Sequence, residues 1–187
     1  MSTRPNSREK ILDAAEDVVK ENGAAHLTLD AVSAKAGVSK GGLLYHFPTK
    51  DAMVRAMVQR IAGSFVDARE KMSASLPSSP GRVLKAYILS EGMFRQKKVL
   101  GIGSAILASG ARDADLLDPV QEFKRELFDK TVSSGIRKAF ANVILLAWEG
   151  LHAREVLGIL DMTPQERQAV IQEMLRLVEE EEARMCK

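Results

Sequence analysis

The sequence predicts an all-α protein, and three observations support this expectation. In every periodic segment, apolar residues recur at the three- and four-residue spacing of a helix. We find no convincing segment with the strict apolar–polar alternation of a half-buried strand. Ala, Leu, Val, Glu, Arg and Lys dominate the composition, which favours helices, and aromatic residues make up only 5% of the chain.

Length and composition bound the class of protein. A chain of 187 residues allows one domain or two small ones and is long enough for a sizeable core. The N-terminus, MSTRPNSREK, is polar throughout, unlike a signal peptide, and the apolar stretch Val143–Trp148 is too short to span a bilayer. The single cysteine, Cys186, allows neither an intrachain disulfide nor a cysteine-based metal site. We therefore expect a cytoplasmic protein without a metal or other cofactor and without a membrane partner.

The first two helices follow from their start and stop signals. A helix is expected over about Ser7–Glu21, because Asn22-Gly23 is a typical helix stop. Thr28 is a candidate N-cap of a short helix that Gly37 ends. This helix places Leu29, Val32 and Ala36 inward.

The next two helices are equally well marked. Ser39 is a candidate N-cap of a second short helix, which Pro48 must end because proline cannot continue it. Thr49 caps a long helix, expected to reach about Met72. Its apolar stripe consists of Met53, Met57, Ile61 and Phe65.

A loop and a second group of helices follow. The segment SASLPSSPGR, residues 73–82, is rich in Ser, Pro and Gly and is typical of a loop between helices. Thr163 and Glu166 form a capping box with proline at the first helical position, which marks the start of the last helix. We expect helices over residues 83–96, 99–109, 119–133, 137–160 and 164–184, and a loop over 111–115.

Two short helices joined by a glycine-containing turn, with a longer helix before them, describe a helix-turn-helix unit. On a helical wheel of the second short helix, Leu43 and Phe47 share the side expected to be buried, and Gly41 and Tyr45 lie opposite. Each glycine inside a helix costs about 1 kcal/mol relative to alanine, so Gly41 and Gly42 require a functional reason. Glycines on an outward face allow close backbone approach by a partner, commonly a phosphate.

The basic charge of the chain is local. The net charge is only +2, but three lysines and no acidic residue fall between Ala31 and Lys50. Lys40 and Lys50 flank the outward face of the second short helix, as a small nucleic-acid-docking surface would need. The same features fit the ordinary exposed face of a three-helix unit. His46 fits a packing or capping role as well as a phosphate contact.

The N-terminal third closely resembles the DNA-binding domain of the TetR family of bacterial transcriptional repressors, in ILDAAEDVVKENG…LTLDAVSAKAGVSKGGLLYHFPTKDAMVRAMV. The resemblance covers about Arg8 to Val58. It rests on Ile-Leu-x-Ala-Ala in the first helix, the closing Asn-Gly, Ala-Gly-Val-Ser at the turn, and Tyr-His-Phe followed by a lysine. Membership implies an all-helical homodimer: an N-terminal helix-turn-helix domain, here residues 5–65 with the motif at 28–47, precedes a ligand-binding and dimerisation domain, here 66–187.

The resemblance also implies which residues contact DNA. Two positions depart from the commonest pattern of the family: Gly42 stands where Thr, Ser or Ala is frequent, and Leu44 replaces the first tyrosine of the usual pair. A hydroxyl contact to phosphate is therefore lost at Gly42, and Leu44 either packs at the domain edge or touches a thymine methyl group. The positions that match the family's DNA contacts are Thr28, Ser39, Lys40, Gly41, Gly42, Tyr45, His46 and Lys50.

Two long C-terminal helices predict a homodimer. The segment ANVILLAWEGL is apolar nearly all round, which is more than one helix face of a monomer can bury. In the last helix an apolar stripe lies against an acidic run, Glu179–Glu182, expected to be solvated. Two such helices from each chain would form a four-helix interface with two-fold symmetry, although two helices packed within a monomer would show the same pattern. The stripe consists of Val170, Ile171, Met174, Leu177 and Val178.

Residues of the C-terminal half are candidates for a pocket that binds a small-molecule effector. Each aromatic residue among them could equally belong to the ordinary core of a helical bundle. Glu149 and His152, two polar residues in a very apolar helix, could orient a ligand or pair across the dimer. The glycines at Gly101–Ser104 lack the preceding strand of a nucleotide-binding loop and fit close helix crossing better. The candidates are Tyr87, Met93, Phe94, Phe123, Phe128, Phe140, Trp148, Glu149 and His152.

The expected function is that of a ligand-responsive repressor that binds a palindromic operator in double-stranded DNA as a dimer. The long helix from Thr49 to Met72 is the expected lever, because it connects the DNA-binding part to the C-terminal half. The alternatives are an activator with the same fold and a helical small-molecule sensor or adaptor that does not bind DNA. An enzyme is disfavoured, because three histidines and one terminal cysteine supply no metal-ligand spacing and no nucleophile–base motif.

Overall fold

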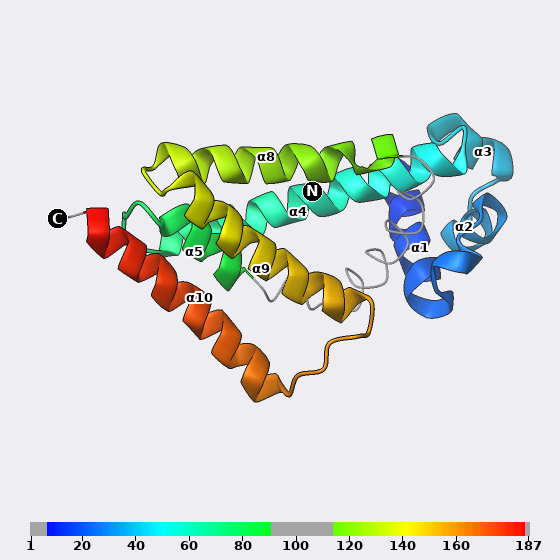
Figure 1. Ribbon diagram of the computed structural model, residues 1–187. Coiled ribbons are helices and arrows are strands. Elements are labelled where there is room, and N and C mark those ends of the chain that lie inside the picture. The colour runs from blue at the N-terminus through cyan, green and yellow to red at the C-terminus, as the bar shows by residue number, and fades with distance from the viewer. Residues whose placement is uncertain (1–6, 91–113, 186–187) are drawn as a thin grey trace. The chain divides into compact units, whose positions relative to one another are not determined.

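The computed structural model describes residues 7–90 and 114–185, and every regular element in these two ranges is a helix (Figure 1). The predicted all-α class is therefore confirmed. The elements are α1 (Ser7–Asn22), η1 (Ala24–His26), α2 (Leu29–Ala36), α3 (Lys40–His46), α4 (Lys50–Ser75), α5 (Arg82–Leu89), η2 (Ala114–Leu117), α8 (Asp118–Ser133), α9 (Lys138–Val156) and α10 (Pro164–Met185).

The chain consists of two compact units. The N-terminal unit comprises Met1–Ala62 and Gln96–Val120, and the C-terminal unit comprises Gly63–Arg95 and Gln121–Lys187. Helix α4 contributes residues to both units and continues over 26 residues.

Several predicted features fall partly outside the described ranges. Of the helix predicted over residues 83–96, α5 represents the first part. Ser90 caps α5. Outside the described residues lie positions 91–96 of that predicted helix, including Met93 and Phe94, and the helix predicted over 99–109. The loop predicted over 111–115 enters the described part at η2, whose first residue is Ala114.

Side-chain caps begin the helices of the N-terminal unit as predicted. The hydroxyls of Thr28, Ser39 and Thr49 each accept a hydrogen bond from the backbone N–H three residues later, at 3.1, 3.1 and 3.0 Å. Gly37 ends α2 with a φ of 61°, and its N–H donates to the carbonyl of Ala34. Such a left-handed conformation favours glycine because it has no Cβ. These local signals produce the predicted helix-turn-helix.

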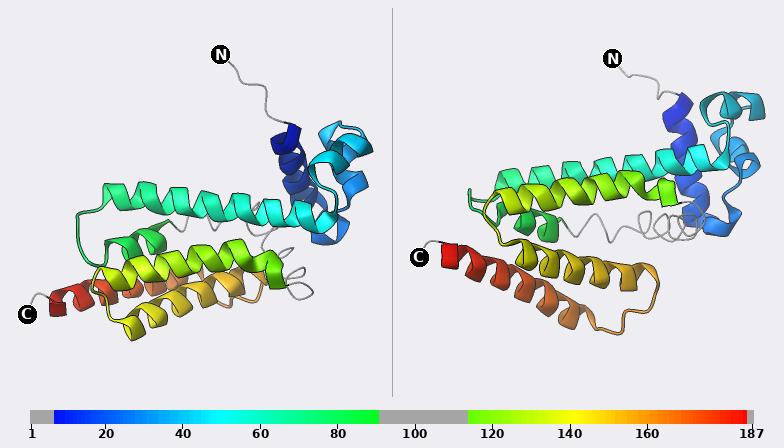
Figure 2. Two further views of the ribbon diagram at one scale, coloured as in Figure 1. Left: turned by 90° about the horizontal axis from the view of Figure 1, so that it is seen from above. Right: turned by 45° about the horizontal axis from the view of Figure 1, so that its top comes forward.

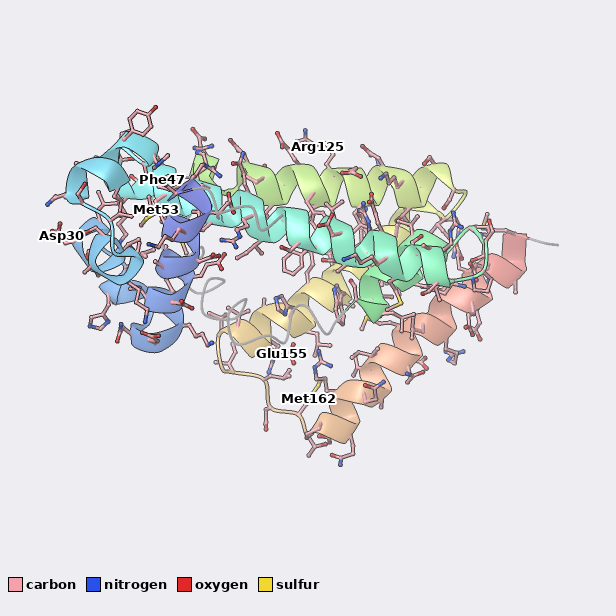
Figure 3. All side chains as sticks on the ribbon, turned by 180° about the vertical axis from the view of Figure 1, so that it is seen from behind. Asp30, Phe47, Met53, Arg125, Glu155 and Met162 are labelled. Carbon is pink, nitrogen blue, oxygen red and sulfur yellow. The ribbon has the colours of Figure 1, made fainter. Side chains whose placement is uncertain are left out.

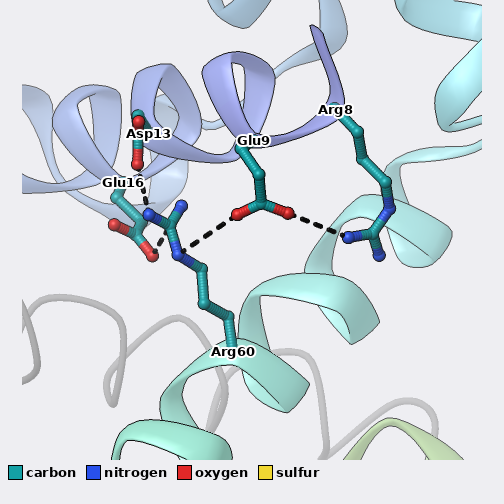
Figure 4. Close-up of polar contacts among 5 residues, drawn as sticks. All are labelled: Arg8, Glu9, Asp13, Glu16 and Arg60. Carbon is teal, nitrogen blue, oxygen red and sulfur yellow. Dashed lines mark hydrogen bonds and ion pairs between the residues drawn. The ribbon is translucent and has the colours of Figure 1, made fainter. Parts of the chain in front are cut away.

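An arginine of α4 joins that helix to α1 inside the N-terminal unit (Figure 4). Arg60 lies 3.8 Å from Glu9 and 3.7 Å from Glu16, and it also donates a hydrogen bond to Asp13. The three carboxylates share one face of α1, because they are spaced by four and three residues. Glu16 is only 2% exposed, and a buried carboxylate is costly unless a cation accompanies it. This arginine therefore fixes how the first half of α4 packs on α1.

Helices α9 and α10 run antiparallel in the C-terminal unit (Figure 2). At one end Arg137 donates two hydrogen bonds of 2.6 Å to Glu181, and at the other end Arg167 binds Glu155 at 2.5 Å. The predicted capping box at Thr163 also forms, because the backbone N–H of that residue donates to the carboxylate of the residue three positions later, at 2.7 Å.

The end of α9 differs from the prediction. The helix stops at Val156 rather than near Leu160. Gly158 adopts a φ of 67°, and the N–H of Ile159 returns to the carbonyl of Arg154 at 3.0 Å. This is the hydrogen-bond pattern of a glycine-terminated helix, and the prediction overlooked the glycine as a stop signal.

The last helix buries more of its surface within the chain than expected. Ile171, Met174 and Val178 of the predicted stripe are between 0% and 4% exposed. The acidic run is also only partly solvated, because Glu181 is paired with an arginine and Glu182 binds Lys85 at 2.8 Å. The reason is that this end of α10 packs against α5. The expectation of a wholly solvated acidic run is therefore wrong.

Replacing Arg60 by alanine is expected to destabilise the N-terminal unit by about 1–3 kcal/mol, because Glu16 would lose a cationic partner in a buried place. Urea unfolding followed by circular dichroism measures the loss. Arg55→Ala is the matched control on the same helix: Arg55 pairs with Asp118 at 3.5 Å, but both side chains are well exposed, and such a pair contributes about 0–1 kcal/mol. Equal losses in the two variants would contradict the importance of the buried carboxylate.

Candidate nucleic-acid interface

Helix α3 has one buried side and one exposed side. Leu43 is fully buried and Phe47 is 2% exposed, whereas Tyr45 is 84% exposed. The guanidinium of Arg8 on α1 lies 5.4 Å from the ring of Phe47, so the buried side is packed toward the first helix. Leu44 lies at the margin, 37% exposed. The helical wheel therefore predicted the orientation of the helix correctly.

The two glycines of α3 differ in their surroundings. A Cβ added at Gly41 would meet no atom within 4 Å, so packing within the chain does not require glycine there. A Cβ at Gly42 would lie 3.2 Å from the hydroxyl of Ser39, which caps the helix. The tight cap thus gives a local reason for Gly42. Packing within the chain gives no comparable reason for Gly41, where the space is open.

Two of the three lysines that the sequence places in an acid-free segment have acidic neighbours in space. Lys40 forms an ion pair of 2.8 Å with Asp30 in the first turn of α2, and Lys35 binds Glu21 at 2.7 Å. Asp30 immediately precedes the segment in sequence, whereas Glu21 lies ten residues before its start, on α1, and folding brings both acids to the segment. Within the described ranges, Lys50 has no such ion pair. The free positive charge of this surface is therefore smaller than the sequence suggests.

The aromatic residues of α3 lie beside each other. Tyr45 and His46 have ring centroids 5.1 Å apart in an edge-to-face arrangement. The histidine is half-buried, whereas the tyrosine hydroxyl end projects into solvent. An exposed ring with a terminal hydroxyl can lie against a sugar and donate to a phosphate.

The structure places all eight predicted DNA-contact residues on two short helices or their flanks. Six of them are exposed, and His46 and Lys50 are half-buried. They share one continuous stretch of the helix-turn-helix and the first residue of α4. In order, they are Thr28, Ser39, Lys40, Gly41, Gly42, Tyr45, His46 and Lys50.

The aromatic pocket candidates of the C-terminal unit form a buried cluster. The ring centroid of Tyr87 lies 5.9 Å from that of Phe123 and 6.2 Å from that of Trp148, and all three are 6% exposed or less. Phe128 and Phe140 are half-buried. This arrangement fits a core as well as a pocket wall.

The polar pocket candidates have partners within their own chain. Glu149 binds Lys124 at 2.8 Å. His152 lies 3.8 Å from Glu155, the residue that Arg167 holds. Burial lowers the pKa of His152 below its ordinary value, and the neighbouring carboxylate of Glu155 opposes this effect only in part. The neutral form of the imidazole is therefore favoured near neutral pH.

Sequence reasoning missed three charged residues that the structure makes prominent: Asp30, Arg60 and Arg69. Arg69 is 2% exposed on α4 and binds Glu126 at 3.2 Å. The sequence contained a signal for the burial of Arg69, because this residue lies four positions after Phe65, the last residue of the apolar stripe in the helix after Thr49. The sequence contained no comparable signal for the ion pair of Asp30, because its partner Lys40 lies on the next helix.

The described residues contain no helix that is long and apolar enough to cross a membrane. They also contain no group of three or more His, Cys, Asp or Glu side chains arranged to hold a metal ion.

Two domain families of TetR-type regulators match successive parts of this chain. The one described as bacterial regulatory proteins, tetR family, matches residues 11–57, and the one described as a tetracyclin repressor-like C-terminal domain matches residues 81–179. The chain is 27% identical over 97 residues to the transcriptional regulator BetI of Stenotrophomonas maltophilia, covering 52% of this chain and 48% of BetI. It is 33% identical over 102 residues to UidR of Escherichia coli, covering 46% of this chain and 52% of UidR. The chain thus spans about half the length of these relatives.

Solved structures share the fold over nearly the whole chain. A transcriptional regulator from Rhodococcus sp. Rha1 superposes with a TM-score of 0.76 at 18% identity, and the match covers 92% of this chain and 96% of the regulator's chain. The multidrug-binding protein EbrR in complex with malachite green superposes with a TM-score of 0.72 at 23% identity, covering 92% and 98%. At such identities the likeness concerns the fold.

Replacing Gly41 by leucine is expected to abolish DNA binding while it raises stability by up to about 1 kcal/mol, because the site is open and leucine favours a helix. Gly63→Leu is the matched control, since Gly63 is also helical, exposed and open. Fluorescence anisotropy and thermal unfolding are the two measurements. Retained DNA affinity in Gly41→Leu would refute close backbone approach at this position.

Replacing Asp30 by asparagine is expected to strengthen DNA binding, because it releases Lys40 and removes a negative charge beside the predicted phosphate contact. The logarithm of the affinity should fall more steeply with salt, by about one unit of slope. Glu21→Gln, which removes the partner of Lys35, is the control and should change the slope less. An unchanged affinity and slope in Asp30→Asn would mean that Lys40 does not face phosphate.

Proposed function

This chain belongs to the TetR family of bacterial regulatory proteins, which are DNA-binding transcriptional regulators, and on that basis we propose that it is a ligand-responsive repressor. In this proposal a homodimer binds a palindromic operator through α3 of each chain. A small molecule bound by the C-terminal unit releases the DNA. The observation that carries the proposal is the outward face of α3, where the packing of the chain gives no reason for Gly41.

In this proposal helix α3 enters the major groove, and four residues of the surface, Lys40, Gly41, Tyr45 and Lys50, have defined roles. Gly41 allows the backbone to approach the DNA, and Tyr45 lies against the sugar-phosphate chain. Lys50 contacts a phosphate with a charge that no described carboxylate neutralises. Lys40 does so after it exchanges Asp30 for a phosphate oxygen; this exchange is feasible because both partners are more than 60% exposed.

The outer face of α9 is the proposed dimer contact. Val143 is 62% exposed and Leu146 is 68% exposed, although both sit in the middle of a long helix. They belong to an exposed row at alternating four- and three-residue spacing, the pattern of a helix–helix seam. Its small members permit close approach of a second helix. The row consists of Ala139, Val143, Leu146, Gly150, Ala153 and Leu157.

The final helix has a smaller part in this contact than expected, because its exposed side is charged. Arg176 on that side is already paired with Glu173 and Glu180. A two-fold contact along α9 would still place the same surface of both chains together and present two α3 helices to one operator. Dimeric helix-turn-helix proteins place their reading helices about 34–36 Å apart, one turn of DNA.

Ligand response requires a connection between the two units, and α4 provides one along the chain. Its first residue, Lys50, belongs to the proposed DNA surface, and Arg69 lies in the C-terminal unit. A ligand that binds one arrangement of the dimer more tightly would shift the population toward it, typically by about 1–3 kcal/mol.

Operator binding and dimerisation can be tested together. We expect tight binding, with two chains per site, to the DNA upstream of the protein's own gene or to another single operator, and weaker, salt-sensitive binding to scrambled DNA. Leu146→Glu is expected to give a monomer in analytical ultracentrifugation and to lose operator binding at least about tenfold, because a charge on each chain would face its symmetry mate. Gln172→Glu, on the exposed side of α10, is the control. A dimeric Leu146→Glu protein would refute the α9 contact, and equal affinity for all DNA would refute sequence-specific repression.

A further inference from the structure

One strongly buried charge in the C-terminal unit has no role in the proposal above. Arg69 on α4 has a side chain that is 3% exposed. A guanidinium remains charged at any physiological pH, so its burial is costly unless all its N–H groups find acceptors. The hydrogen-bond acceptors of the Arg69 guanidinium therefore have to be identified.

The described partners of Arg69 use only one side of the guanidinium. Nη2 donates to Glu126 at 3.2 Å and lies 4.0 Å from Glu70. Glu126 is itself shared, because Lys130 approaches it to 2.5 Å and is the main cause of its lowered pKa. Nη1 is buried and has no hydrogen-bond acceptor among the described residues. Among the described residues, the Nη1 group of this buried guanidinium is thus left without an acceptor.

The surroundings of this guanidinium are aromatic. Its carbon lies 5.6 Å from the ring centroid of Phe123, whose ring lies 6.1 Å from Phe65 and 5.9 Å from Tyr87. Trp148, at 6.2 Å from Tyr87, extends the cluster. A flat apolar body could stack against such rings, and a cation over an aromatic face is favourable in itself.

The hydroxyl of Tyr87 lies within the electrostatic reach of this arginine. Burial raises the pKa of Tyr87, Glu149 raises it further, and the charge of Arg69 acts in the opposite direction. The hydroxyl is therefore neutral and can donate as well as accept. Together with Nη1, it could supply a second polar contact for a ligand that enters the cluster.

We propose that the effector is an apolar carboxylic acid, whose carboxylate binds Nη1 of Arg69 and whose body packs on Phe123, Tyr87 and Trp148. This inference rests on the proposed ligand response of the C-terminal unit and names the chemical class of the ligand. A carboxylate supplies the missing acceptor and forms a charge-assisted hydrogen bond with a guanidinium. A cationic ligand would bring a like charge against Arg69, and a neutral one would leave the buried cation only weakly compensated.

Three probes with the same ring distinguish these classes: phenylacetate, phenylacetamide and phenethylamine, which are anionic, neutral and cationic. Trp148 is the only tryptophan of the chain, so its fluorescence reports directly on the cluster. Ligand-observed NMR provides an independent affinity. We expect the acid to bind about tenfold more tightly than the amide, the difference that a charge-assisted hydrogen bond supplies, and the amine to bind most weakly.

Arg69→Gln should remove the preference for the acid. Arg125→Gln is the matched control, because Arg125 is exposed on α8 (Figure 3) and should leave the preference unchanged. Arg69→Lys keeps the charge without the planar fork and should retain part of the preference. If Arg69→Gln fails to fold, the ranking of the three probes on the unmodified chain still decides.

The proposal is overturned if the acid binds no more tightly than the amide and the amine, or if none of the three probes binds at millimolar concentration. It is also overturned if folded Arg69→Gln keeps the preference for the acid. DNA binding without probes, measured by anisotropy on the same preparations, separates this inference from the proposed function. Operator binding without acid preference refutes only the ligand class. Acid preference without DNA binding refutes the repressor and leaves the acid site.

Discussion

The burial of Leu43 and Phe47 is the constraint on which the proposed DNA-binding surface depends. Helix α3 has only seven residues, two of them glycine, and would not be stable as an isolated helix. Two apolar side chains one turn apart hold it against the N-terminal unit and fix its rotation about its own axis. Gly41 and Tyr45 must then face outward, since the helix period leaves them no alternative. The glycines therefore both weaken the helix and leave its outer face open, and tertiary packing supplies the stability that the isolated helix lacks.

Ion pairs serve two different purposes in the N-terminal unit, and burial distinguishes them. Arg60 meets a carboxylate that is almost inaccessible, Glu16, so their interaction cannot be exchanged for water or for a ligand without a large cost. Lys40 and Asp30 are both exposed, and their interaction contributes little to stability. An exposed pair of this kind can open when a phosphate arrives. The same chemistry therefore stabilises the scaffold in one place and leaves a replaceable contact at the proposed DNA surface in another.

Helix α9 combines a core side and an exposed apolar side. Trp148 and Leu151 on one side are buried within the chain, whereas Val143 and Leu146 on the other are exposed, so a monomer leaves part of its most apolar helix in water. The aromatic cluster beneath α9 contains the buried guanidinium of Arg69. In the proposed ligand site, such a cation would give the apolar interior a chemical preference among ligands that a purely apolar interior would lack.

Local signals in the sequence were sufficient for the helices, for most of their ends and for the orientation of α3. A cap such as Ser39 acts on a backbone group three residues away, and an apolar repeat such as Leu43 and Phe47 acts within one turn, so both can be read without a fold. Tertiary structure alone decided the electrostatics. Asp30 neutralises Lys40, and Arg69 is buried beside Glu126, because folding brings together charges from different helices. Coulomb interactions depend on distance in space and on burial, and neither quantity can be read from the order of residues along the chain.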